Sequence, residues 1–404
     1  MQKGYLSEYF TGVASKVLSA VEADVTTSNQ HEYNGVAPLK RIFGTARQIF
    51  DAKFMYLNDE DSEPVVDNGF LTWYDAREAH PTRTEFRMYF PTTAVSVLAS
   101  EGDELFIALR PNRTVLVVIA ECGSTICNQL HWLFGIGESD HFSVRNELDT
   151  EQDKLAFASR LILEHLGIRV EQSAESLLDD MIQRFGNQFP STREFSAYAR
   201  LTLPDICSGD NPDIVLMKWM EREEILFRTF ERHLISERLT QGFEGDVDGF
   251  FQFSLSAQNR RKSRAGQALE NHIEELFSSR GIMYDRTKVT ENHAKPDFIF
   301  PSINAYHDIS FNTELLTMLG VKSTCKDRWR QVLSEANRIR EKHLLTLEAA
   351  ISKNQTDEMR ADNLQLVVPE AIQETYSSEQ QGWLISVAEF IEILQFRQRA
   401  LIWR

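Results

Sequence analysis

Two carboxylates and a lysine stand close to short apolar segments in the second half of the chain. Asp297 directly precedes FIFP, Lys322 follows Val321 in the expected strand 318–324, and Glu335 follows thirteen residues later. Hydrolysis of a phosphodiester needs charge neutralised on the phosphate and an activated water, and a Mg²⁺ ion held by carboxylates supplies both. A lysine can position that water and offset charge in the transition state. We therefore predict a metal-assisted phosphodiester hydrolase with Asp297 and Glu335 as metal ligands and Lys322 as the catalytic lysine.

The spacing of these residues departs from the common nuclease pattern, in which a second acid stands two residues before the lysine. Gly320 occupies that position and cannot bind a metal ion. We therefore expect Glu335 to supply the missing carboxylate from a helix that follows the strand. Glu270, in the helical segment RAGQALENHIEELF, is a candidate supplementary carboxylate, and a solvated helix charge is the alternative. Taken alone, the Pro-Asp dipeptide at 296–297 is more typical of a turn than of a metal site.

A triplet of alternating charge, Lys326-Asp327-Arg328, follows the lysine strand. Lysine and arginine donate hydrogen bonds to guanine O6 and N7 in the major groove, whereas a carboxylate accepts from cytosine N4. The triplet is therefore suited to reading adjacent G·C pairs, and a solvated helix start with an incidental ion pair is the alternative. A second basic cluster suits contacts with backbone phosphates. It consists of Arg260, Arg261, Lys262 and Arg264.

Length and composition indicate two domains with cores of their own, since the chain has 404 residues of which 42% are hydrophobic. A net charge of -17 argues against a protein that coats nucleic acid, but not against an enzyme with its basic residues in one cleft. No apolar run approaches the roughly 18 residues that span a bilayer, and the start lacks a basic segment followed by an apolar one. We therefore expect a cytoplasmic protein. The four cysteines are too scattered for a disulfide framework or a zinc site.

The N-terminal part is predicted to be all-β, because short apolar segments alternate there with turn residues and without long helices. The last two strands read as a hairpin with the three-residue turn PNR. The expected strands are 54–57, 70–76, 84–90, 104–110 and 114–121, with weaker helical segments at 18–25 and 41–52 and one helix near 154–166. We assign residues 1–165 to this domain and residues 166–185 to a linker.

The C-terminal part, residues 186–404, is predicted to be α/β with a mixed central sheet, because apolar strands alternate there with segments of helical period. Ser191 and Glu194 have the spacing of a capping box, and Gly281 is a plausible helix stop. The expected strands are 297–300, 318–324 and 364–368. The expected helices include 213–240, 326–350 and 385–400.

Four segments carry a resemblance to a known family: NRRKSRAGQALE, KPDFIFPS, AYHD and VKSTCKDRWRQ. They are similar to the catalytic domain of the EcoRII-like type II restriction endonucleases, in the CCGG-reading branch of the PD-(D/E)xK nucleases. The similarity covers about residues 185–404, and a displaced second acid is a property of that branch. The resemblance implies that Asp297, Lys322 and Glu335 are catalytic with help from Lys326. It also implies that the triplet at 326–328 reads a CC:GG half-site.

The N-terminal domain resembles more weakly the effector-binding domain of the same family, a DNA-binding pseudobarrel with Arg, Glu and Arg at alternate positions of one strand. Arg83, Glu85 and Arg87 keep that alternation. Alternate residues of a strand share one face, so the resemblance implies that the three side chains bind effector DNA. An exposed strand with cross-paired charges is the alternative.

Members of this branch also flip the central base of an odd-length site against an aromatic or arginine side chain. Trp219, flanked by Lys218 and Arg222, is the candidate for such a pocket. A core tryptophan is the alternative.

The resemblance implies a Mg²⁺-dependent, type IIE restriction endonuclease that cuts double-stranded DNA at a CCNGG- or CCWGG-like site and leaves 5′ overhangs with 5′-phosphates. The expected partners are one or two copies of the DNA site and a second copy of the chain in a homodimer, with no membrane. A cognate bacterial DNA methyltransferase is expected as a functional, not a physical, partner. Two alternatives stay open: a sequence-specific repressor on an inactive nuclease fold, and a less specific defence or repair nuclease.

Overall fold

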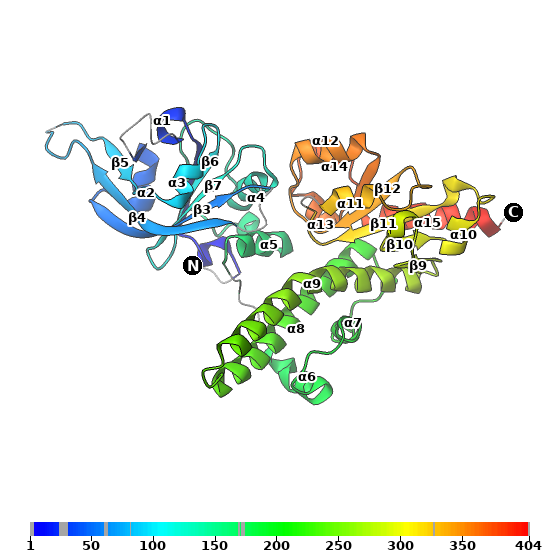
Figure 1. Cartoon of the computed structure of the whole chain (residues 1–404). Coiled ribbons are helices and arrows are strands. Elements are labelled where there is room, and N and C mark those ends of the chain that lie inside the picture. The colour runs from blue at the N-terminus through cyan, green and yellow to red at the C-terminus, as the bar shows by residue number, and fades with distance from the viewer. Residues whose placement is uncertain are drawn as a thin grey trace. The chain divides into compact units, whose positions relative to one another are not determined.

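The computed structural model describes residues 4–23, 31–59, 64–80, 82–168, 170, 174–325 and 328–402. The chain divides into two compact units, each with a sheet of its own (Figure 1). The N-terminal unit comprises the residues up to 168 together with 349–356, and the C-terminal unit comprises 169–348 and the residues from 357 onward. Within the described ranges, no helix is long and apolar enough to cross a membrane.

Eight strands form one sheet in the N-terminal unit. They are β1 (Gly12–Val17), β2 (Glu32–Asn34), β3 (Gln48–Leu57), β4 (Val65–Asp75), β5 (Phe86–Tyr89), β6 (Glu104–Leu109), β7 (Val115–Ala120) and β8 (Ser143–Arg145). The order is β2-β5-β4-β3-β7-β6-β1-β8, and β3 and β7 are parallel whereas the other neighbours are antiparallel. The predicted hairpin is confirmed, because β6 pairs with β7 and the Arg110 N–H bonds to the Thr114 carbonyl at 2.9 Å. Closure of the sheet into a pseudobarrel stays a prediction.

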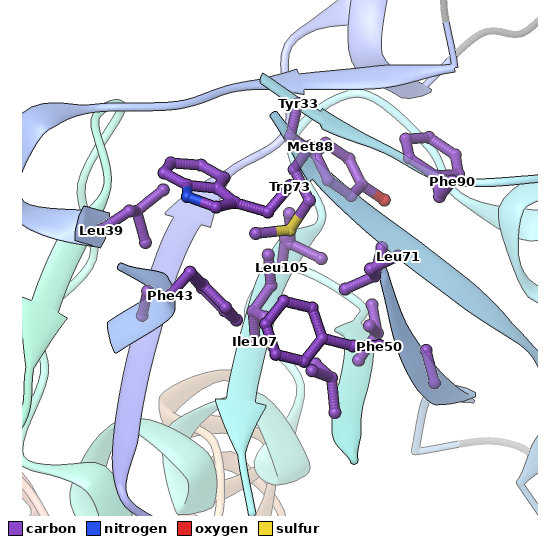
Figure 2. Packing of buried hydrophobic residues seen from close by; sticks show 14 of the residues in the cluster. Tyr33, Leu39, Phe43, Phe50, Leu71, Trp73, Met88, Phe90, Leu105 and Ile107 are labelled. Atoms are coloured by element: carbon purple, nitrogen blue, oxygen red, sulfur yellow. The ribbon is translucent and has the colours of Figure 1, made fainter. Parts of the chain in front are cut away.

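The core of the N-terminal unit lies on one face of this sheet (Figure 2). Leu105 and Ile107 of β6 point into it and pack with Phe50 and Trp73, because alternate strand residues share a face. On the opposite face, Phe106 contacts a phenylalanine of α4 (Thr125–Phe134). Both faces of β6 and β7 are therefore covered, which explains their uninterrupted apolar sequences.

The predicted helix at 41–52 is wrong beyond its first turn. Helix α2 (Lys40–Phe43) ends at Gly44, which has a φ of 80°, and β3 begins at Gln48. Phe50 and Phe54 are buried while Ile49 is exposed, and this alternation has the period of a strand. The other helices of the unit are α1 (Ala20–Ala23), α3 (Ala94–Leu98) and α5 (Phe157–His165), and the last confirms the helix predicted near 154–166.

The C-terminal unit has the predicted mixed sheet, with the order β13-β12-β11-β10-β9. The strands are β9 (Asp285–Arg286), β10 (Phe298–Phe300), β11 (Thr317–Lys322), β12 (Lys342–Thr346) and β13 (Leu364–Val367). β11, β12 and β13 run parallel, whereas β9 and β10 join antiparallel. The helix predicted over 326–350 is wrong, because β12 lies inside it and the α-helix in the described part of this range is limited to α11 (Trp329–Leu333). A short buried apolar run such as KHLLT fits a strand as well as a helix.

Two long helices, α8 (Pro212–Gln241) and α9 (Val247–Ser279), pack side by side in the C-terminal unit (Figure 1). The expected helix at 213–240 is thus confirmed, and α15 (Val387–Ile402) confirms the one at 385–400. The capping box of Ser191 and Glu194 opens α7 (Thr192–Leu201), and α9 ends just before Gly281, which has a φ of 66°. The remaining helices of this part of the chain are α6 (Leu178–Phe185), α10 (Ile303–His307), α12 (Lys353–Ala361), α13 (Glu370–Gln373) and α14 (Ser378–Gln381).

The second half of the predicted linker, 166–185, is ordered structure rather than a connection. It contains α6, whose Met181 is buried in a cluster with Phe195 of α7 and Phe230 of α8. The C-terminal unit therefore begins near residue 169 rather than at 186.

Candidate active site

The ends of β10 and β11 bring Asp297 and Lys322 together. Asp297 precedes β10, Lys322 ends β11, and the two strands are antiparallel neighbours. Lys322 Nζ donates to Asp297 Oδ2 at 2.8 Å, and the Val321 N–H donates to the same oxygen at 2.7 Å. The register of the sheet thus places the predicted lysine and the first predicted metal ligand in one site.

Glu335 lies in the same electrostatic neighbourhood, but on the loop just after α11 and not on a helix as expected. Burial, and after it the negative charge of Asp297, raise the pKa of its carboxyl to about 7, although Lys322 and Lys342 oppose the rise. Among the described residues, the buried Oε2 atom of Glu335 has no hydrogen-bond partner. A buried carboxylate oxygen without a partner, close to a second carboxylate, is an arrangement that a bound cation would stabilise.

These two carboxylates fit a Mg²⁺ ion, which proteins commonly hold through one or two carboxylates plus water and substrate phosphates. Asp297 and Glu335 would supply the protein ligands. In the part of the chain that the structure describes, no group of three or more histidine, cysteine, aspartate or glutamate residues could hold a metal ion. The remaining ligands would then be water and phosphate oxygens.

A cleft of about 610 Å³ opens over Lys322 and is bounded on one side by α9. Glu270 of α9 lines it, as predicted for the supplementary carboxylate, and pairs with Arg286 of β9 at 2.7 Å. Burial raises the pKa of the Glu270 carboxyl, the Arg286 guanidinium opposes the rise and the charge of Asp297 adds to it. The full lining is Asn259, Arg260, Ser263, Gly266, Gln267, Glu270, Val321, Lys322, Ser323 and Arg328.

The triplet predicted to read bases is described in part. Arg328 lines the cleft and stands directly before α11. Lys326 and Asp327 lie outside the described residues. The base-reading role of the triplet stays a prediction.

The residues of the basic cluster predicted to contact phosphates differ in the groups that they contact. Arg260 lines the cleft, and its guanidinium lies 4.6 Å from the centre of the Phe189 ring. Arg261 pairs with Glu231 of α8 at 2.6 Å. The side chain of Lys262 lies outside the described part of the structure. The fourth member, Arg264, points into the protein, as the following contacts show.

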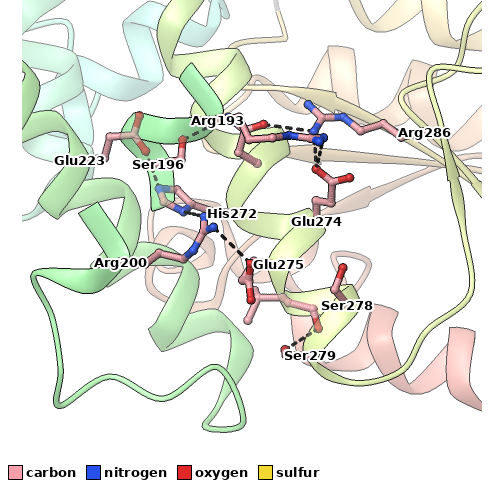
Figure 3. A network of polar contacts seen from close by, with 12 residues as sticks. Arg193, Ser196, Arg200, Glu223, His272, Glu274, Glu275, Ser278, Ser279 and Arg286 are labelled. Atoms are coloured by element: carbon pink, nitrogen blue, oxygen red, sulfur yellow. Dashed lines mark hydrogen bonds and ion pairs between the residues drawn. The ribbon is translucent and has the colours of Figure 1, made fainter. Parts of the chain in front are cut away.

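A buried network of charges joins α7, α8 and α9 (Figure 3). Arg264 is only 5% exposed and forms an ion pair with Glu223, so it is directed away from solvent and from DNA phosphates. His272 Nε2 lies 2.8 Å from Glu223, and Arg200 lies 3.3 Å from the other ring nitrogen. Trp219 is 2% exposed beside His272 and Arg200. The structure thus places Trp219 in the core, the alternative that the sequence left open.

The buried pair predicts a large difference between two arginines of the same cluster. Arg264→Ala removes the guanidinium that Glu223 faces, and breaking a buried ion pair typically costs about 3–5 kcal/mol. Arg260→Ala removes a partly exposed ring contact, for which about 1 kcal/mol is the expected loss. Urea unfolding of both variants measures the free energy of unfolding. Equal losses would show that Arg264 does not hold the helices together.

Two of the three residues predicted to bind effector DNA, Glu85 and Arg87, are ion-paired in the N-terminal unit. Arg87 of β5 contacts Glu85 at 2.6 Å and Glu32 at 2.7 Å, which is the cross-pairing named as the alternative. Arg83 is exposed and precedes the strand, with its N–H bonded to His80 Nδ1 at 3.1 Å. The three side chains therefore do not form one row on a strand. Their role in binding DNA stays a prediction.

The sequence did not reveal that Arg286 contacts Glu270, a residue of the cleft lining. It pairs with Glu270 and also with Glu274 of α9. β9 has only two residues, too few for an apolar alternation to mark it as a strand. No local pattern could therefore have placed this arginine beside α9.

The resemblance seen in the sequence is confirmed by comparison with known proteins. Residues 227–391 match the family model described as EcoRII C terminal. Over 205 residues the chain is 41% identical to the type II restriction enzyme EcoRII of Escherichia coli, covering 50% of each protein. Over 113 residues it is 31% identical to the type II restriction enzyme SsoII of Shigella sonnei, covering 26% of this chain and 36% of that enzyme. The chain spans half or less of the length of these curated relatives.

Two solved complexes are similar in structure at a lower level. Metal-depleted Ecl18kI in complex with uncleaved, modified DNA has a TM-score of 0.46 and 18% identity, covering 57% of this chain and 86% of that one. The complex of the restriction endonuclease PspGI with substrate DNA has a TM-score of 0.44 and 17% identity, covering 52% of this chain and 94% of that one.

Proposed function

We propose that this chain is a Mg²⁺-dependent type II restriction endonuclease that hydrolyses both strands of DNA at a specific site. The observation that carries the proposal is the 2.8 Å contact of Lys322, which lines the cleft, with Asp297, together with the buried Glu335 Oε2 atom, which has no hydrogen-bond partner among the described residues. The EcoRII C-terminal domain matched over residues 227–391 contains all three residues and supports the same reaction.

The chemistry of the site follows from the contacts of these side chains. When bound, Mg²⁺ would neutralise charge on the phosphate and acidify a water. Lys322, held at 2.8 Å by Asp297, keeps its ammonium group directed into the cleft, where it offsets the charge of the pentavalent phosphate. Glu270 adds a carboxylate on the opposite wall. Glu335 Oε2, which has no hydrogen-bond partner within the described ranges, would supply the second carboxylate oxygen for the metal ion.

Site specificity is proposed to come from Lys326, Asp327 and Arg328, reading the CC:GG halves of a CCNGG- or CCWGG-like sequence. The position of Arg328 in the cleft lining supports this role. A two-fold-symmetric site is most simply read by two copies of the chain, each cutting one strand to leave 5′-phosphates on 5′ overhangs. A cytoplasmic enzyme of this kind needs a DNA methyltransferase as its functional partner.

The N-terminal unit is proposed to bind a second copy of the DNA site and to regulate cleavage, as in a type IIE enzyme. Support for this comes from the resemblance of the N-terminal sequence and from the exposure of Arg83, which precedes β5. Arg87 and Glu85 would contribute only if DNA displaced their mutual ion pair.

Digestion of phage DNA in the presence of Mg²⁺, with sequencing of the ends, tests the function. We expect discrete fragments whose 5′ extensions begin at a CC-N-GG-like sequence, and faster cutting of plasmids with two sites than with one. A smear would indicate a less specific nuclease. Binding without cleavage on DNA with many sites would indicate a repressor on an inactive nuclease fold.

A further inference from the structure

Arg286 connects the catalytic sheet to the helix that forms one wall of the cleft. Its Nη2 atom lies 2.7 Å from Glu270 Oε2, and its Nη1 atom lies 2.5 Å from Glu274 Oε2 and 3.1 Å from Asn271 Oδ1. Figure 3 shows the contact with Glu274. The Arg286 side chain is only 17% exposed, so solvent screens these contacts weakly. One side chain thus forms hydrogen bonds or ion pairs with three residues on one face of α9.

The same arginine stands one strand away from Asp297. In the sheet, Arg286 of β9 is the register partner of Phe298, the residue that follows Asp297. The N–H of Thr287 also donates to the Asp297 carbonyl at 3.1 Å. Arg286 therefore joins the strand pair that carries Asp297 to the helix that carries Glu270.

The contact with Arg286 involves one carboxylate oxygen of Glu270 and leaves the other available to the cleft. Arg286 uses Oε2, and among the hydrogen bonds of the described residues Oε1 receives none. Asn259, Ser263 and Gly266 precede Glu270 along α9 at intervals of four, three and four residues, and all four line the cleft. This is the spacing of one helix face. Glu270 is therefore the last cleft residue of that face, next to the point where Arg286 fixes it.

We propose that Arg286 is a positioning residue for DNA cleavage. This role rests on the proposed nuclease function. It holds the Glu270 carboxylate so that Oε1 accepts a hydrogen bond from a water in the cleft, at a fixed distance from Asp297. The planar fork of arginine can hold Glu270 and Glu274 together, whereas a lysine ammonium would act as a single point of charge. A flexible Glu270 would lose this orientation without losing its charge.

The chain offers a matched control for this role. Arg193 of α7 also pairs with Glu274 Oε2, at 2.8 Å, and belongs to neither the cleft lining nor the contacts of Glu270. Arg193→Met removes an arginine from the same glutamate while the cleft contact stays in place. If Arg286 only anchored α9, Arg286→Met and Arg193→Met would lower the cleavage rate by similar factors.

The test is single-turnover cleavage by the full chain with Mg²⁺, for Arg286→Met, Arg286→Lys, Glu270→Gln, Arg193→Met and the double variant Arg286→Met/Glu270→Gln. We expect Arg286→Met to lower the cleavage rate about 10- to 100-fold, the usual effect of removing a side chain that orients a functional group. DNA affinity should stay unchanged. Arg286→Lys should recover part of the rate, and Arg193→Met should cleave like the unaltered protein.

The double variant decides whether Arg286 acts through Glu270. If it does, the double variant is no slower than Glu270→Gln alone, because residues that act as a unit are not additive. Losses that multiply, or an equal loss in Arg193→Met, would overturn the positioning role. Circular dichroism and thermal unfolding show that each variant is folded. No cleavage by the unaltered protein would instead refute the nuclease function, and the positioning role with it.

Discussion

Lys322→Ala is expected to lower the rate of DNA cleavage by about 10³-fold while DNA binding is retained, a loss within the usual range for a catalytic proton-transfer group. The ammonium group lies 2.8 Å from Asp297 and lines the cleft, so its removal takes away the positive charge nearest to the phosphate. It also removes one of the two lysine charges, Lys322 and Lys342, that favour the ionised form of Glu335 beside Asp297. The measurement is single-turnover cleavage, with electrophoretic mobility shift for binding.

Lys288→Ala is the matched control for this variant. Lys288 is an exposed lysine of the same unit and does not belong to the lining of the cleft. We expect it to cut like the unaltered protein. A Lys322→Ala variant that cleaves within a few-fold of the unaltered rate would rule out a catalytic role for this lysine.

Glu335→Gln is expected to abolish Mg²⁺-dependent cleavage and yet to stabilise the metal-free protein at pH 8. Burial and the charge of Asp297 raise the pKa of Glu335 from 4.5 to about 7 in the folded state. Well below pH 4.5 the Glu335 carboxyl is protonated in both the folded and the unfolded protein, so it does not lower the free energy of unfolding. As the pH rises, the unfolded chain releases its proton first, so the folded state loses up to about 3 kcal/mol of relative stability by pH 7.

Urea unfolding at pH 5 and pH 8 with a chelator measures this difference. The variant's advantage in free energy of unfolding should be small at pH 5 and largest at pH 8. Mg²⁺ should then stabilise the unaltered protein more than the variant, because a ligand stabilises the state that binds it. Glu341→Gln is the control, since Glu341 is 59% exposed and pairs only loosely with Arg397 at 3.6 Å. If the variant is less stable than the unaltered protein at pH 8, ionised Glu335 does not destabilise the metal-free protein as expected.

The sequence predicted best where local pattern and tertiary structure agree. The alternating or continuous apolar runs of β6, β7 and β11 specify strands, and the register of β10 and β11 then brings Asp297 to Lys322. It failed at β12, where a buried apolar run has no period that separates strand from helix. The partners of Glu270 and Arg264 could not be predicted either, because Arg286 and Glu223 reach them from separate elements.

The parallel pairing of β3 with β7 has a consequence for how the N-terminal unit assembles. β6 and β7 meet across the three-residue turn 111–113, whereas Ala52 of β3 and Val115 of β7 are about sixty residues apart in the chain. The entropy lost in closing a loop grows with its length, by about 0.6 kcal/mol for each doubling. The central pair is therefore expected to form after the hairpins β3–β4 and β6–β7 on either side of it, which join residues nearer to one another in the chain.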